Sequence, residues 1–261
     1  MRWCAGVEYI GSAYGGWQAQ RHVDSVQARV ESALSEIAAM PTTVSCAGRT
    51  DAGVHAQQQV VHFDTTAQRS DHAWLLGVNS RLPQDISLRW IRQPAAEDFH
   101  ARHSARARRY RYVIHNARGR SAIAAGRATW WTWPLDAGRM HAAAQALVGE
   151  HDFSSFRASE CQSPTPVRLL HSIDVTRQGE YVFIDVRANA FLHHMVRNIA
   201  GSLLLVGQGR AEIAWVSEVL EARDRKLAGP TASPHGLYFV GPEYPARFAV
   251  PAPPSPIHAL P

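Results

Sequence analysis

The order of apolar and polar positions over the first hundred residues predicts two helices among four strands. Side chains from Trp3 to Tyr9 alternate as in a strand. Asp24 or Ser25 can cap the helix that follows, because both side chains accept hydrogen bonds from free backbone amides. The apolar side of this helix is formed by Val26, Val30, Leu34 and Ile37. The remaining elements are strands at 42–46, 59–63 and 86–92 and a helix at 69–79. This half therefore has the order β-α-β-β-α-β.

The second half repeats this order more loosely. Strands are predicted at 108–115, 167–176, 181–188 and 236–240. Helices are expected to begin at Asp136 and to cover 191–206 and 211–223. The fold class is α+β, with halves at 1–100 and 101–244 and an extended Pro-rich tail at 245–261. We expect two RRM-like or ferredoxin-like halves that form a continuous, mainly antiparallel, curved sheet, flanked by helices, with a central basic cleft.

Composition is typical of a globular protein of the cytoplasm. The 261 residues are 46% hydrophobic and 19% charged, which excludes a disordered chain. The most apolar stretch, Ile199–Val206, is far shorter than the roughly 20 residues of a membrane span. Glu8 interrupts the apolar run that a signal peptide needs. The three cysteines are far apart and form no CxxC motif, which argues against disulfides and zinc and fits a reducing compartment.

The distribution of charge indicates a polyanionic partner. The formal net charge is +5, and no acidic residue occurs between Asp98 and Asp136. That acid-free segment contains Arg102, Arg106, Arg108, Arg109, Arg111, Arg118, Arg120 and Arg127. A run of positive charges without acidic residues is unfavourable unless solvent or a polyanion neutralises it. A nucleic-acid backbone is the obvious candidate for that polyanion.

The most informative motif is the run Gly48–Ala56, which places Asp51 between two glycines. Glycine permits backbone torsions that other residues avoid, so Asp51 is expected to project from a tight loop between two strands. Taken alone, such a loop is more often a plain Asx turn.

The run from Gly48 to Ala56 resembles the signature loop of the TruA-type tRNA pseudouridine synthases. Further segments match this family in its own order: 16–20, 25–27, 59–63, 77–79, 82–83, 99–102, 107–112, 153–157, 191–198 and 236–238. The chain departs from the family pattern at Ile10 and Gly15, outside the central loop. The resemblance therefore covers nearly the whole chain.

The resemblance implies an isomerase that converts uridine to pseudouridine at positions 38 to 40 of the tRNA anticodon arm, without cofactor or metal. It implies that Asp51 is the nucleophile. Attack at uracil C6 and attack at the ribose would each use this one carboxylate, so the sequence does not distinguish them. It also implies a homodimer in which one tRNA contacts both subunits.

The family pairs its aspartate with the arginine that matches Arg197. An opposite charge within about 4–6 Å keeps a carboxylate ionised in a closed pocket. The alternative for Arg197 is an arginine on the surface of a helix. Tyr110 matches the active-site tyrosine, which can stack on a flipped uracil or move the C5 proton. Alternatively, Tyr110 and Tyr112 are ordinary strand residues on one face, one in the core and one lining the cleft.

Arg49 matches the family residue that takes the place of the flipped base, and a simple phosphate contact is equally compatible with the sequence. The other arginines expected to touch tRNA phosphates are Arg102, Arg106, Arg108 and Arg111.

Four other kinds of function are less compatible with the sequence. Adjacent His193 and His194 would diverge on a helix, and His100 and His103 lack a third ligand, so no metal site is expected. The absence of a Gly-rich phosphate loop argues against a nucleotide cofactor. A non-catalytic RNA-binding protein would not need Asp51, and a metal-dependent nuclease would need clustered carboxylates.

Overall fold

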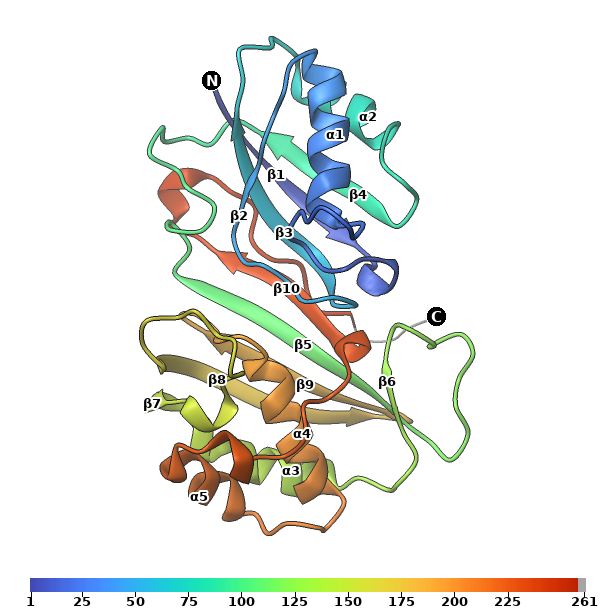
Figure 1. The fold of residues 1–261 in the computed structure, drawn as a ribbon, viewed down its shortest axis with the longest axis vertical. Helices are drawn as coiled ribbons and strands as arrows, with labels where there is room; N and C mark the ends of the chain where they lie inside the picture. The colour runs from blue at the N-terminus through green and yellow to red at the C-terminus, as the bar shows by residue number, and fades with distance from the viewer. Residues whose placement is uncertain (258–261) are drawn as a thin grey trace. The chain divides into compact units, whose positions relative to one another are not determined.

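The computed structural model describes residues 1–257, so the last four residues of the predicted tail lie outside the described residues. The described part is α+β, with ten strands and five α-helices (Figure 1). Its strand pairs are mainly antiparallel, and β5 and β6 form a parallel pair. This confirms the predicted class. The chain forms two compact units, Met1–Arg106 with Phe239–Pro256 and Ala107–Tyr238 with Ile257. The cleft predicted between two halves stays a prediction.

The first unit is a sheet with two helices, in the predicted order. Its strands are β1 (Arg2–Tyr9), β2 (Ser45–Cys46), β3 (His55–Asp64), β4 (Ile86–Arg92) and most of β10 (Leu237–Glu243). They lie in the order β4-β1-β3-β10, and β2 pairs with β3. The helices are α1 (Val26–Ala38) and α2 (Asp71–Asn79). Ser25 caps α1 by accepting the Ala28 amide, which decides between the two predicted caps.

The core of this unit forms where α2 packs on the sheet. Trp3 and Phe63 are register partners on β1 and β3, and both rings lie within 6 Å of the Trp74 ring of α2. All three side chains are buried. The alternation that predicted β1 therefore places Trp3 on the face that receives α2.

The second unit contains the other strands and helices. Its strands are β5 (Ala107–Asn116), β6 (Thr129–Trp131), β7 (Gly149–Asp152), β8 (Val167–Gln178) and β9 (Tyr181–Ala188), and its helices are α3 (Ala137–Ala144), α4 (Met195–Gly207) and α5 (Trp215–Ala222). The strand order is β5-β9-β8-β7, with β6 beside β5. Asp136 caps α3 by accepting the Arg139 amide, as its position predicted. β6 and β7 are additions to the predicted set.

The beginning of the Pro-rich tail is packed, not merely extended on the surface. Phe248 is 1% exposed, and its ring lies 5.3 Å from the ring of Phe99. The Phe248 carbonyl accepts the Ala95 amide, and Arg247 pairs with Asp98 at 2.7 Å. The tail thus belongs to the core of the first unit because an aromatic residue anchors it.

Candidate active site

Asp51 lies in the loop between β2 and β3, at the first position of a tight turn. The Val54 amide donates to the Asp51 carbonyl at 3.1 Å, and Gly53, at the third position, has φ +78°. A turn with positive φ only at its third residue is type II, which favours glycine there. The Asp51 side chain is partly exposed. The turn therefore fixes the backbone that carries the carboxylate and leaves its side chain accessible.

The two glycines that flank Asp51 have different roles. The prediction that both supply unusual torsions is correct for Gly53 and wrong for Gly48, whose φ is not in the left-handed region. A Cβ on Gly48 would have no neighbour nearer than Phe239, at 3.9 Å. The Gly48 amide instead donates to the Gln59 side chain at 3.3 Å, and the Gln59 amide donates back to the Gly48 carbonyl. Strand β3 therefore holds this end of the loop through a buried glutamine.

The Gly- and Tyr-rich segment before α1 supports the Asp51 loop from the other side. The Trp17 amide donates to the Thr50 carbonyl at 3.0 Å, and the Tyr9 hydroxyl bonds the Thr50 hydroxyl at 2.8 Å inside the core. Gly16 has φ +99°, and a Cβ there would lie 2.8 Å from the Thr50 carbonyl oxygen. Only glycine allows so close an approach. The carboxylate thus stands on a rigid base.

The two tyrosines of β5 differ in burial, as the alternative with one of them in the core requires, and a cleft lined by the other stays a prediction. Tyr112 is buried, and its hydroxyl bonds Thr129 at 2.5 Å and the Ser233 carbonyl at 2.8 Å. Burial raises the pKa of Tyr112 well above its ordinary value. Tyr110 is only partly buried, and the edge of its ring meets the Phe191 ring at a centroid distance of 5.0 Å. Tyr110 is therefore the tyrosine of this pair that can contact a base.

Arg197 lies in the first turn of α4 and is partly buried. Its Nε donates to the Ala232 carbonyl at 2.8 Å, which orients the guanidinium. Asp51 belongs to the first unit and Arg197 to the second, and their ion pair stays a prediction.

Helix α4 begins at Met195, four residues later than expected. His194 has φ +60°, a left-handed conformation that no α-helix contains, and it precedes the first turn. The prediction that His193 and His194 diverge on a helix is therefore wrong: both precede the helix, and their ring centroids lie 4.0 Å apart. The absence of a metal stays a prediction.

The predicted RNA-contact arginines fall into two groups. Arg49, Arg102 and Arg106 are exposed, whereas Arg108 is partly buried and donates to the Asn189 carbonyl at 2.8 Å. Arg111 is 6% exposed and forms a bidentate pair with Asp185, at 2.7 and 2.6 Å. Its guanidinium carbon also lies 4.7 Å from the centroid of the Phe183 ring. The surroundings of Arg111 are those of a structural ion pair.

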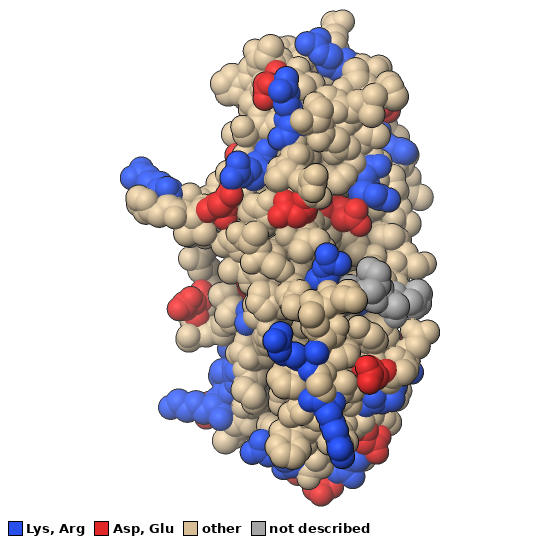
Figure 2. All heavy atoms as spheres, turned by 90° about the vertical axis from the view of Figure 1, so that its right-hand side faces the viewer, with Lys and Arg blue, Asp and Glu red and all other residues tan. Residues whose placement is uncertain are grey.

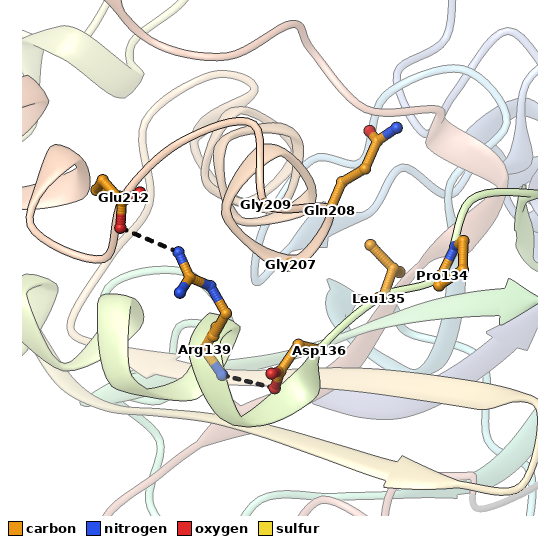
Figure 3. Close-up of a pocket in the computed structure, with 8 residues that line it drawn as sticks. All are labelled: Pro134, Leu135, Asp136, Arg139, Gly207, Gln208, Gly209 and Glu212. Atoms are coloured by element: carbon orange, nitrogen blue, oxygen red, sulfur yellow. Dashed lines mark hydrogen bonds and ion pairs between the residues drawn. The ribbon is translucent and has the colours of Figure 1, made fainter.

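Two open hollows occur in the second unit. One, of about 520 Å³, lies between α3 and the end of α4, where Arg139 reaches Glu212 at 3.2 Å (Figure 3). The other, of about 370 Å³, shares Pro134 and Leu135 with it. Neither is lined by a residue expected to act on uridine.

The face drawn in Figure 2 carries blue basic side chains with red acidic ones among them. None of the described helices is long and apolar enough to cross a membrane.

Comparison with known proteins identifies the family. Residues 5–104 and 143–245 match the family model of tRNA pseudouridine synthase. The tRNA pseudouridine synthase A of Aeromonas hydrophila subsp. hydrophila is 58% identical over 96% of this chain and 93% of its own length. Those of Escherichia fergusonii and Salmonella arizonae are each 58% identical over 95% of this chain and 92% of theirs. The chain belongs to the tRNA pseudouridine synthase family, whose members are isomerases.

Sequence reasoning did not identify the residues that hold the Asp51 loop. Gln59 is fully buried in β3, where it follows two other glutamines, and Tyr9 is 1% exposed at the end of β1. The available signal for Gln59 was its place directly before Val60 and Val61 in a predicted strand, because an amide buried there needs partners.

Proposed function

We propose that this chain isomerises uridine to pseudouridine at positions 38, 39 and 40 of the tRNA anticodon stem-loop, without cofactor or metal. The bond from the ribose to N1 breaks, the uracil turns, and a new bond forms through C5. The observation that carries the proposal is the type II turn that presents Asp51 from a rigid base, in a chain of this family. A carboxylate held in this way is suited to act as a nucleophile.

Asp51 engages the nucleoside directly, at uracil C6 or at the ribose. A base stacked in a stem cannot reach a carboxylate on a protein loop, so the target uridine must leave the helix at a cost of a few kcal/mol. Arg49 is exposed two residues before Asp51, and its planar guanidinium can take the place of the flipped base or hold a neighbouring phosphate.

Tyr110 and Arg197 complete the proposed catalytic set. The partly buried ring of Tyr110 can stack on the flipped uracil, which is worth about 1–3 kcal/mol, and its hydroxyl can help to move the C5 proton. In the proposal Arg197 pairs with Asp51 and keeps the carboxylate ionised.

Arg102, Arg106 and Arg108 are proposed as contacts to tRNA phosphates, which set the position of the RNA without reading its sequence. Arg111 is better suited to a structural role, since Asp185 already neutralises it. The proposed assembly is a cytoplasmic homodimer in which one tRNA contacts both subunits, as the family resemblance implies.

Release of tritium from C5-labelled uridine in a tRNA transcript tests the proposal. We expect Asp51→Ala and Asp51→Asn to fall below about a thousandth of the wild-type rate, because the nucleophile is lost. Both variants should still bind tRNA. Asp71→Asn, on the exposed start of α2, is the matched control and should keep its activity. A rate for Asp51→Ala of a tenth of the wild type or more contradicts the mechanism.

A further inference from the structure

The loop Phe99–Ser104 has an irregular backbone whose polar groups are bonded mainly by side chains. Arg2 donates to the Phe99 carbonyl at 2.8 Å, and the Tyr244 hydroxyl donates to the Ala101 carbonyl at 2.6 Å. The Ser104 hydroxyl accepts the amide of residue 100 at 3.0 Å. Backbone polar groups that are partly removed from water need such partners, so these side chains help to determine the conformation of the loop.

Two histidines accept the three amides at 101–103. Nδ1 of His62, on β3, accepts the Ala101 amide at 3.1 Å. Nδ1 of His100 accepts the amides of Arg102 and His103 at 3.1 and 3.3 Å. A backbone N–H can only donate, so each Nδ1 must carry a lone pair. Both rings are therefore neutral, with the proton on Nε2.

The two rings lie next to each other. The centroid of the His100 ring is 4.5 Å from that of His62 and 4.3 Å from that of the exposed His103. Phe99 and Ala101 are fully buried, whereas Arg102, between Ala101 and His103, is exposed. The loop thus has a buried anchor on the β3 side and presents an arginine to solvent.

We propose that His62 and His100 are positioning residues for tRNA binding, because their Nδ1 lone pairs hold the loop Phe99–Ser104 in the conformation that presents Arg102 to a tRNA phosphate. The inference rests on the proposed function, and it adds that the loop is preorganised before RNA arrives. Preorganisation lowers the entropy that binding must otherwise spend on ordering a loop.

The test compares substitutions that keep or remove the acceptor at residue 100. His100→Phe retains a ring between His62 and His103 but has no Nδ1, and His100→Asn retains a short acceptor. His103→Ala is the matched control. Among the described residues, the His103 side chain makes no hydrogen bond to the loop backbone, and only the His103 amide takes part. The dissociation constant for tRNA is measured at several salt concentrations, together with kcat and KM for tritium release.

We expect His100→Phe and Arg102→Ala to weaken tRNA binding by a similar factor, about five-fold, and to reduce the salt slope of binding by about one. The double variant should show no further reduction in slope, because both changes remove the same phosphate contact. KM should rise with little change in kcat, His100→Asn should restore most of the affinity, and His103→Ala should bind as the wild type does.

An unchanged salt slope in His100→Phe, or additive losses in the double variant, overturns the inference. Hydrogen exchange of the amides at 101–103, measured on the folded variants, gives a second criterion: exchange as slow as in the wild type also overturns it. Binding and exchange require no turnover. If the wild type released no tritium, the proposed function would fail while these measurements still decided the role of the loop.

Discussion

His62 should make the folded protein sensitive to acid. Its side chain is 6% exposed on β3, and burial is the main cause that lowers its pKa from 6.5 to about 4. The neighbouring His100 and Arg2 act in the same direction, whereas Asp64 and a backbone bond at Ser45 act against it. The perturbation to study is therefore a decrease in pH across this window.

The sign and the size of the effect follow from these pKa values. Between about pH 6.5 and 4 the unfolded chain takes up a proton that folded His62 excludes, so stability falls as the pH decreases. Above and below this window His62 does not change how the free energy of unfolding depends on pH. A decrease of the pKa from 6.5 to about 4 corresponds to about 3 kcal/mol in total, of which about 2 kcal/mol is lost by pH 5. That is a considerable part of the roughly 5–15 kcal/mol that stabilises a typical protein.

Urea unfolding of the wild type and of His62→Gln, at pH 7.5 and pH 5, measures this contribution. The wild type should lose about 2 kcal/mol more than the variant over this interval, because glutamine does not titrate. His72→Gln, on the exposed surface of α2, controls for the loss of one imidazole. If the wild type and His62→Gln lost the same free energy of unfolding, His62 would not be the group that excludes the proton.

Two further predictions concern Arg111 and the Asp51 turn. Arg111→Met should cost about 2–3 kcal/mol, because it leaves the half-buried Asp185 without its cation, and Arg111→Met with Asp185→Leu should regain most of this in thermal melts. An equal loss in the double variant would show that the ion pair is not the cause. Gly53→Ala should cost about 1–2 kcal/mol and slow tritium release, because φ is +78° there. Gly48→Ala is its control for stability, and equal destabilisation of both would show that the torsion does not matter.

Local patterns determined most of the elements and the central motif. Helix α1 and strand β4 follow from apolar spacing and alternation within their own segments, and β4 has the predicted bounds Ile86–Arg92. Ser25 and Asp136 cap their helices because capping needs only the side chain and the next three residues. The loop that presents Asp51 was likewise predictable, since Gly53 is required by a turn of four consecutive residues.

Contacts between distant segments determined the remainder. Strands β6 and β7 have three and four residues, too few for a periodic pattern, and exist because β5 and β8 offer them partners. Arg111 resembled its neighbours in the basic run until the β5–β9 register placed it opposite Asp185. Gln59, His62 and His100 hold loops through side-chain hydrogen bonds to distant or irregular backbone, and no spacing rule predicts the partners of such bonds. A sequence determines what each segment can form locally, whereas the partner of a buried polar group depends on which segments the tertiary structure brings within about 3 Å of each other.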